Sequence, residues 1–393
     1  MTDHSTPRSV LRNDGPAGKT RVTNMELFFD LVYVFTIVQL SHYLIEHETW
    51  LGALQAATLF AAVWWAWNYT AWATNWLDPD HPGGRLLMVV LMACALMMAV
   101  AMPGAFTARA GLFVGAYVAM GLIRAGYMAL AFGNQQMGRN YAQLCAWSAI
   151  SGLFWIAGVF LPGMRLPLWI IAVVIDYGAP YINFWLPGPG GTPMHTWTLK
   201  GLHLLERNQQ VFIISLGESI LLLGGLLVGK ELGAGIVVAA AIGFLLIVSL
   251  WWIYFVHVTE TAEHRFQHEA DHTRLARAGL AYAHGIMVCG AIVTAVAIEM
   301  IVARPVEAIH APVALIAAAG PSIFLLGSTI FHRTMAQRMP LSYVVAIAAL
   351  VCWSLLALTL HLNGIWLGAG LLAVMLTLAR TGRAVLTRPR CPA

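Results

Sequence analysis

Charged residues are scarce in this chain of 393 residues. Asp, Glu, Lys and Arg together make up 10% of it, whereas 59% of the residues are hydrophobic, and the mean hydropathy is +0.73. A soluble globular domain carries about 25% charged residues, and a nucleic-acid-binding face needs clustered Lys and Arg. The composition therefore excludes both classes and indicates a membrane protein with no nucleic-acid partner.

Other familiar signals are missing too. The five cysteines are scattered, so neither a disulfide framework nor a CxxC metal motif is present. Residues 1–24 are polar and lack the apolar core and small-residue cleavage site of a signal peptide. The sequence shows no alternating strand pattern and no internal repeat that relates its two halves. We expect no cofactor.

Long apolar runs are abundant instead, and the bilayer forces such runs into helices because their backbone groups must bond internally. We expect helices near 26–46, 50–77, 84–106, 111–132, 140–161, 166–186, 201–229, 233–258, 274–302, 310–332, 342–361 and 364–382. The predicted fold is all-α, a polytopic membrane bundle of about twelve transmembrane helices. It forms one domain, 25–383, between a polar cytoplasmic tail, 1–24, and a basic cytoplasmic tail, 384–393.

The basic residues set the predicted orientation. With the N-terminus inside and twelve spans, sixteen of the 22 Lys and Arg residues lie on the cytoplasmic side. Four lie outside, namely Arg109, Arg165, Lys230 and Arg304, and Arg124 and Arg207 lie within spans. Cytoplasmic loops carry an excess of Lys and Arg, so we expect a protein of the inner (plasma) membrane with both termini in the cytoplasm.

Polar groups concentrate at the start of one apolar helix, in residues 203–220. At 100° per residue one side of this helix carries all of the following: His203, Glu206, Arg207, Gln210 and Glu218. Ionisable groups cost about 2.5–3.5 kcal/mol each on membrane-insertion scales. We interpret this side as functional; the alternative is an ion pair of Arg207 that only clamps neighbouring helices.

The first predicted helix also carries acids into the membrane. Glu26 and Asp30 lie one turn apart, and the helix ends with Ser41 and His42. We expect Glu26 or Asp30 to lie close to Arg207, because an unpaired arginine in hydrocarbon is too costly. For Glu26 the alternative is a favourable interaction with the helix dipole, which does not explain Asp30.

Further polar and aromatic residues are candidates for lining the same chamber. Trp64, Trp65, Trp67 and Trp72 run toward the middle of the second helix, although packing or an interfacial belt is the alternative. Asp176, Tyr282 and His284 lie within later spans.

Two segments are weak metal candidates. Asp78 and Asp80 are able to hold a divalent cation, but Asp-Pro-Asp before Gly-Gly favours an ordinary turn. Residues 268–272 match the zinc-protease pattern HExxH in a charged loop, where adventitious metal binding is the stronger interpretation.

Five motifs occur together in this chain: Glu-Leu-Phe-Phe-Asp-Leu-Val-Tyr-Val-Phe at 26–35, Gln-Leu-Ser-His at 39–42, Trp-Trp-Ala-Trp at 64–67, Glu-Arg at 206–207 with Leu-Gly-Glu-Ser at 216–219, and Tyr-Ala-His at 282–284. In this combination the chain resembles the bacterial low-temperature-requirement protein A family over about residues 20–380. The resemblance implies a multi-pass membrane protein without naming a reaction. The chain departs from the family pattern at Val256-His257, where an acid is usual, and at Asn208-Gln209. These departures leave a specialised activity open.

Three functions fit these residues. The favoured one is a membrane-embedded enzyme that performs acid–base chemistry, of the proton-initiated cyclase or isomerase type, on a lipophilic, isoprenoid-like or lipid-like substrate. There Asp30 or Glu218 gives a proton, His203 or His284 takes one up, and tryptophan rings stabilise a cation. The predicted catalytic set is Asp30, Glu218, His203, Glu206, Arg207 and His284, and the predicted substrate-binding set is Glu26, His42, Trp64, Trp65, Trp67, Trp72, Gln210, Asp176 and Tyr282.

The second function is proton- or ion-coupled transport of a small molecule, for which intramembrane acids and histidines are typical. The missing inverted repeat counts against it. The third is a non-catalytic sensor or scaffold. Membrane lipid and a lipophilic or small-molecule substrate are the expected partners, and the sequence does not indicate an oligomeric state.

Overall fold

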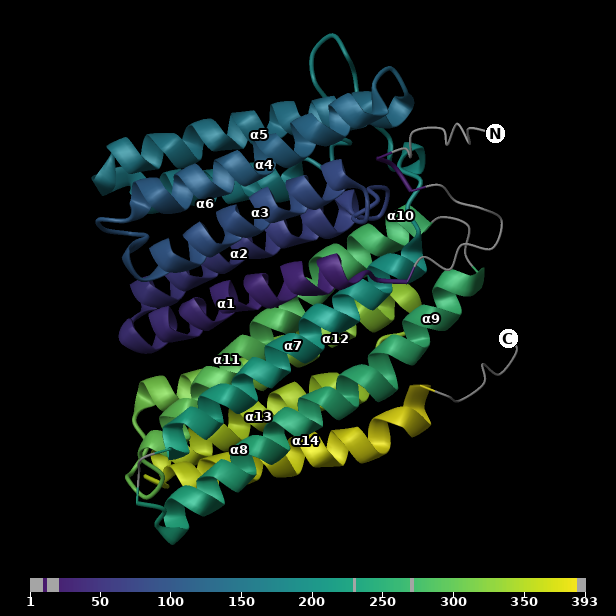
Figure 1. Ribbon diagram of the computed structural model, residues 1–393. Helices are drawn as coiled ribbons and strands as arrows, with labels where there is room; N and C mark the ends of the chain where they lie inside the picture. Colours follow the sequence, from purple (N-terminus) through teal and green to yellow (C-terminus); the bar gives the residue numbers. More distant parts are fainter. Residues whose placement is uncertain (1–9, 13–20, 229–230, 269–271, 387–393) are drawn as a thin grey trace, which may run out of the picture. The chain divides into compact units, whose positions relative to one another are not determined.

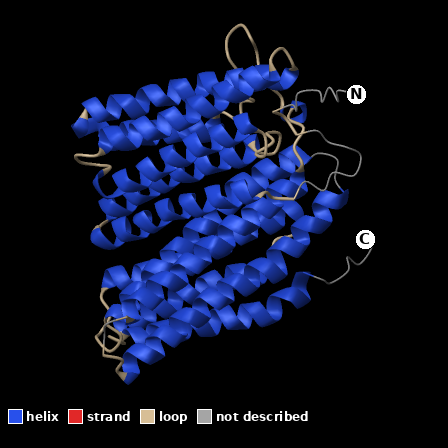
Figure 2. Cartoon of the chain, in the orientation of Figure 1, coloured by secondary structure: helices blue, strands red, loops and turns tan. Residues whose placement is uncertain are grey.

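Helices make up almost all of the regular structure. The computed structural model describes residues 10–12, 21–228, 231–268 and 272–386, and β-pairing within them is limited to isolated bridges (Figures 1 and 2). The all-α prediction is therefore confirmed for the described residues.

The helices follow the predicted ranges closely. In the first half they are α1 (Asn24–Glu46), α2 (Trp50–Ala73), α3 (Pro82–Ala101), α4 (Ala110–Phe132), α5 (Gln136–Phe160), α6 (Arg165–Gly178) and α7 (Gly201–Leu227). In the second half they are α8 (Ala234–Trp252), α9 (Thr259–His268), α10 (His272–Leu275), α11 (His284–Ala303), α12 (Ala311–Met335), α13 (Leu341–Thr359) and α14 (Gly364–Leu386).

Two of the long helices contain π-helical segments. The segment Ile253–Val258 joins α8 to α9, and the segment Ala276–Ala283 joins α10 to α11. With these joins the described chain forms twelve helices, of which ten are long and apolar enough to cross a membrane. The chain is therefore a multi-pass membrane protein.

Helix α6 is shorter than the predicted span of 166–186. It ends at Gly178, two residues before Pro180. Proline does not continue a helix, because it lacks the amide hydrogen that a helix needs. Asn183 and Phe184 then adopt left-handed φ angles of 54° and 50°. The backbone therefore leaves the helix before the apolar run ends.

The described chain divides into two compact units. The first contains residues up to Arg207 and also residues 271–274, and the second contains 208–270 and 275 onward. In the first unit α1 packs against α2 and α3, and α4 packs against α3, α5 and α2. The single transmembrane domain expected over 25–383 stays a prediction, because compact units are not by themselves domains that fold alone.

In the second unit α11 and α12 approach each other closely. A Cβ added at Gly290 would lie 2.2 Å from the Phe324 backbone nitrogen, and one at Gly320 would lie 2.5 Å from the Thr294 backbone nitrogen. Small residues let membrane helices pack backbone to backbone. These two glycines therefore set the spacing of the helix pair.

Candidate functional site

The carboxylate of Glu26 is positioned by the start of α1. Thr23 is the N-cap residue, and its hydroxyl oxygen accepts a hydrogen bond from the Glu26 amide at 3.3 Å. In return, Oε2 of Glu26 accepts the Thr23 amide at 2.9 Å. This reciprocal pattern is a capping box. The helix-end interpretation of Glu26 is therefore right for one of its two oxygens.

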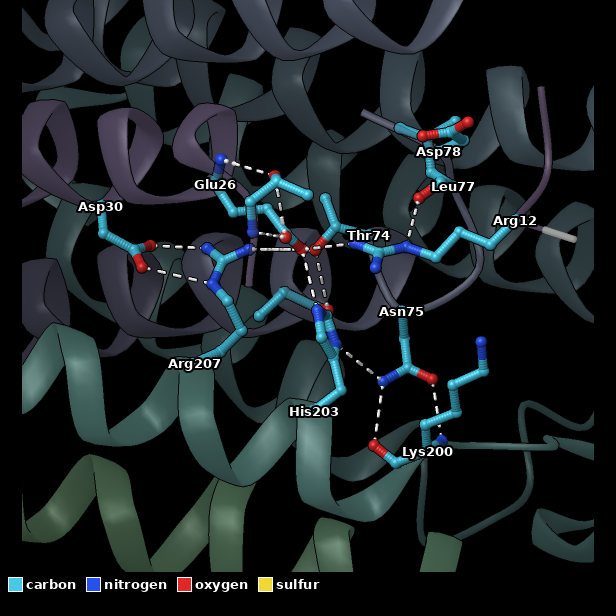
Figure 3. Close-up of polar contacts among 12 residues, drawn as sticks. Arg12, Glu26, Asp30, Thr74, Asn75, Leu77, Asp78, Lys200, His203 and Arg207 are labelled. Carbon is cyan, nitrogen blue, oxygen red and sulfur yellow. Dashed lines mark hydrogen bonds and ion pairs between the residues drawn. The ribbon is translucent and has the colours of Figure 1, made fainter. Parts of the chain in front are cut away.

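The other oxygen of Glu26 faces three basic side chains. Oε1 lies 3.1 Å from Nη2 of Arg12 and 3.2 Å from Nη1 of Arg207. It also lies 3.2 Å from Nε2 of His203 (Figure 3). Two guanidinium groups and one imidazole thus share a single carboxylate oxygen, in a place where the Glu26 and Arg207 side chains are fully buried.

Asp30, one turn further along α1, binds Arg207 through both oxygens. Nη2 of Arg207 donates to Oδ1 at 2.6 Å, and Nε donates to Oδ2 at 3.2 Å. Trp67 of α2 donates its indole hydrogen to Oδ1 at 2.8 Å. The predicted proximity of the first-helix acids to Arg207 is confirmed. A two-pronged pair of this kind is the strong geometry for arginine and carboxylate.

The end of α2 completes the surroundings of α7. Thr74 accepts a hydrogen bond from Nη1 of Arg207 at 3.0 Å. The side chain of Asn75 bonds the backbone of Lys200, accepting from its amide at 2.8 Å and donating to its carbonyl at 3.1 Å. The amide nitrogen of Asn75 also lies 3.2 Å from Nδ1 of His203 (Figure 3).

These bonds determine the neutral form of His203. The Lys200 amide is only a donor, so it must face Oδ1 of Asn75, and the Asn75 nitrogen must then face His203. Because that nitrogen donates, Nδ1 of His203 accepts, and the ring hydrogen sits on Nε2 beside Glu26. A second proton on Nδ1 would face a donor and would displace Asn75.

Arg12 is the member of this site that sequence analysis missed. It was assigned to the polar tail, but Leu11 forms an isolated β-bridge with Leu77, and Nε of Arg12 donates to the Leu77 carbonyl at 2.8 Å (Figure 3). No periodicity in the tail predicts this contact. We call the set Arg12, Glu26, Asp30, His203 and Arg207 the Arg207 cluster; all of it lies in the first unit.

The tryptophans of α2 lie inside the protein. The exposed fractions of Trp64, Trp65, Trp67 and Trp72 are 3%, 2%, 1% and 7%. The ring of Trp65 stacks on Tyr177 with centroids 4.0 Å apart. The interior interpretation is therefore right for their location, whereas their role in binding a substrate stays a prediction.

Three other predicted residues of the first unit lie apart from these contacts or at their edge. Glu206 is half-buried beside Arg207 in α7. His42 is half-buried near the far end of α1, about 18 Å from Asp30 at the helical rise per residue. Asp176 is buried on α6, where Tyr117 of α4 donates to it at 2.7 Å. Asp176 thus belongs to a second set of polar contacts in the first unit, and a chamber shared with the Arg207 cluster stays a prediction.

The remaining predicted residues belong to the second unit. Gln210 and Glu218 are half-buried on α7, and Tyr282 is half-buried in the π-helical segment before α11. His284 is fully buried and contacts the hydroxyl of Tyr254 through Nε2. Tyr254 lies in the π-helical segment Ile253–Val258, and His284 is the first residue of α11, directly after the second π-helical segment. π-helical turns are frequent at functional sites.

The structure fully describes only one of the two candidate metal segments. Asp78 accepts the Asp80 amide at 3.0 Å, and Asp80 pairs with Arg85 at 3.2 Å, so these acids form the expected turn. Most of the segment 268–272 lies outside the described residues. Within the described ranges no group of three or more His, Cys, Asp or Glu side chains is arranged to hold a metal ion.

Comparison with known proteins agrees with the motifs. The family model for bacterial low temperature requirement A protein (LtrA) matches residues 21–380. Uncharacterized protein RA0937 of Rhizobium meliloti (strain 1021) is 35% identical over 336 residues, which is 84% of this chain and 82% of that protein. No solved structure matches. The chain therefore belongs to the bacterial low temperature requirement A protein family.

Proposed function

We propose that this protein is a proton-coupled transporter of a small solute, and that the Arg207 cluster is its proton-operated switch. One observation carries the proposal: a titratable imidazole, His203, shares one carboxylate oxygen of Glu26 with two guanidinium groups. Intramembrane acids and histidines of this kind are the usual parts of proton relays in transporters.

The switch follows from the hydrogen bonds of His203. A proton that binds at Nδ1 meets the amide nitrogen of Asn75, which is itself held by the Lys200 backbone just before α7. Two donors facing each other repel, so Asn75 must release either His203 or Lys200. Proton uptake is thereby coupled to the beginning of α7, the helix that also carries Arg207.

The enzyme hypothesis requires one of the buried acids, such as Asp30, to act as a general acid. A general acid must carry a proton and reach its substrate. Asp30 instead accepts three hydrogen bonds, two from Arg207 and one from Trp67, so both of its oxygens already bind protein groups. The geometry therefore supports transport over cyclase or isomerase chemistry started by Asp30, and the enzyme is the alternative that the experiment must separate.

The orientation belongs to the proposal as well. We place the protein in the inner membrane with both termini in the cytoplasm, because sixteen of the 22 basic residues then face the cytoplasm.

The test uses proteoliposomes that contain a pH-sensitive dye. Panels of amino acids, carboxylates, sugars and cations are added outside, and solute-dependent proton entry is recorded. In the variant Asn75→Asp a carboxylate oxygen faces Nδ1 of His203 and keeps a proton there, while the Lys200 amide retains its acceptor. We expect this variant to lose proton entry.

The matched control is Asn134→Asp, an exposed position outside the cluster, which should behave as wild type. Equal proton entry in Asn75→Asp and wild type would contradict the switch. Product formed from a lipophilic substrate by protein in detergent, where no gradient exists, would establish the enzyme instead.

A further inference from the structure

The second arginine within the membrane, Arg124 of α4, has surroundings unlike those of Arg207. Its side chain is 2% exposed. Nη1 donates to the Ala66 carbonyl at 3.0 Å and to the Thr70 hydroxyl at 3.1 Å, whereas Nε has no hydrogen-bond partner. None of the ion pairs within 4.0 Å among the described residues involves Arg124. Arg124 is thus a buried cation without a direct counter-ion.

Arg124 lines a cavity in the first unit. The walls come from four helices: Trp65 and Tyr69 of α2, Tyr117 of α4, Ser148 and Ser151 of α5, and Asp176 of α6. The ring of Tyr69 lies 5.4 Å from the guanidinium carbon of Arg124. A guanidinium group, a carboxyl group, hydroxyl groups and aromatic rings therefore line a single small space.

The size of the cavity limits what it holds. Its volume is about 20 Å³, and one water molecule needs roughly 10–15 Å³ measured in the same way. An organic solute does not fit, whereas a water molecule or a monatomic ion does. A buried charge is costly unless it is paired. Because Arg124 has no carboxylate in direct contact, its guanidinium group favours an anion over water.

Asp176 determines when an anion is able to enter. Its carboxyl group is faced by Tyr117 and Arg124 of α4 and by Ser151 and Trp155 of α5. Tyr177, on the same helix as Asp176, interacts with Tyr117. Trp65 and Tyr69 of α2 line the same space, and Arg124 is the one cation among these neighbours. Without an anion the cavity is neutral when Arg124 is charged and Asp176 is ionised, so an added anion alone would leave one buried negative charge in excess.

We propose that this cavity binds one small monovalent anion, of which chloride is the example, against Arg124, and that Asp176 takes up one proton when the anion binds. The charges balance: a cation and a carboxylate become a cation, an anion and a neutral acid. The neutral acid also provides a hydroxyl that donates to the anion. This inference does not depend on the proposed transport, because binding is measured on protein in detergent.

The first measurement compares sodium chloride with sodium gluconate at equal ionic strength. A ligand that binds only the folded state raises the melting temperature in a saturable way, so chloride should do so and gluconate should not. In weakly buffered solution each chloride that binds should remove one proton from the medium. Above the pH range in which Asp176 titrates, the chloride Kd should rise about tenfold per pH unit.

Two variants separate the parts of the site. Arg124→Gln should lose the chloride effect, and Asp176→Asn should bind chloride with no proton uptake and no pH dependence. The control is Arg139→Gln, which removes an exposed arginine that bonds Asn134 and Gln136 near the start of α5, and it should respond as wild type.

Three results would overturn the proposal. Equal effects of chloride and gluconate on wild type would mean that the cavity holds only water. A chloride effect that persists in Arg124→Gln would place the ion elsewhere, and proton uptake that persists in Asp176→Asn would remove the role of Asp176. If Arg124→Gln does not fold, bromide in the wild-type protein decides, since its anomalous scattering must appear beside Arg124.

Discussion

Arg207 of α7 and Asp30 of α1 form a two-pronged ion pair across 177 residues of sequence, with nitrogen-to-oxygen distances of 2.6 and 3.2 Å. Both side chains are fully buried. The pair connects the first helix of the first unit to the start of α7. A long-range contact between two charges inside a membrane protein is costly to break from one side only, because the remaining charge stays buried.

The first prediction is that Arg207→Ala strongly destabilises the protein. Removing one partner of a buried ion pair costs about 3–5 kcal/mol, and here Asp30 and Glu26 would both lose a partner. The free energy of unfolding in detergent, measured with a denaturant, should fall by that order.

The control for Arg207 is an exposed ion pair. Arg304 lies 3.8 Å from Glu307, with exposed side-chain fractions of 69% and 64%. Exposed pairs contribute about 0–1 kcal/mol, so Arg304→Ala should be nearly neutral. If both variants had the same stability, the Arg207 pair would not hold α1 to α7.

The second prediction concerns the tail residue Arg12. Its replacement by Ala removes the contact with Glu26 and the bond to the Leu77 carbonyl. Hydrogen bonds to charged groups contribute about 1.5–3 kcal/mol, so the melting temperature should fall, but less than for Arg207→Ala. The nearby exposed Arg21 is the control, and equal effects of Arg12→Ala and Arg21→Ala would show that the tail does not complete the cluster.

The contrast between Arg207 and Arg12 shows what the sequence predicts and what it does not. Arg207 lies in an apolar run, so its need for an acid follows from composition alone, and Asp30 was the available partner. Arg12 lies in a polar tail where a charge needs no partner, so nothing indicated its contact with Glu26. Thr74 and Asn75 are neutral and leave no trace in a hydropathy pattern, although they orient Arg207 and His203.

The helices, too, have features that the sequence predicts and features that it does not. Their ranges follow from apolar runs, because a span must be about twenty residues long. The π-helical segments Ile253–Val258 and Ala276–Ala283 were not predicted, since a local change in helical winding leaves the apolar run intact. The early end of α6 depends on Pro180 and on two left-handed residues, which hydropathy does not register.

The third prediction tests the packing of α11 and α12. Gly290→Ala places a methyl group 2.2 Å from the Phe324 backbone nitrogen, and overpacking costs about 1–3 kcal/mol. Gly224→Ala is the control, because nothing lies within 4 Å of its added Cβ, and alanine is the better helix former by about 0.8–1 kcal/mol. Thermal unfolding should rank Gly290→Ala below wild type, and the reverse order would contradict the close approach.

The fourth prediction is the topology. Twelve spans place both termini on the same side, and the basic residues place that side in the cytoplasm. Reporter fusions at residue 390 and within the loop 188–200 should both report the cytoplasm. A fusion at residue 390 that reports the outside would mean an odd number of spans. In that case only one of α2 and α6 would cross the membrane in addition to the ten helices that are long and apolar enough.

The fifth prediction compares shape with charge at the acids of α1 and α7. Asp30→Asn keeps the size of the side chain and still accepts hydrogen bonds, but it removes the charge that Arg207 binds. Glu218→Gln makes the same change at a half-buried position on α7. If the protein is the proposed transporter, Asp30→Asn should give a folded, inserted protein that retains solute exchange and loses coupling to the proton gradient.

The other acid of α1, Glu26, provides the control for Asp30→Asn. Glu26→Gln should be milder than Asp30→Asn, because Asp30 lies one turn deeper in α1 and binds Arg207 through both oxygens, whereas one oxygen of Glu26 serves the capping box of α1. Each variant is first shown to be monodisperse, and then gradient-driven uptake in vesicles is compared with product formation in detergent. Full function in Asp30→Asn would make the cluster a helix clamp, since an amide can still hydrogen-bond Arg207 and brace the helices. Activity in detergent that is lost in Asp30→Asn would instead make Asp30 an acid of an enzyme, because no gradient exists there to be coupled.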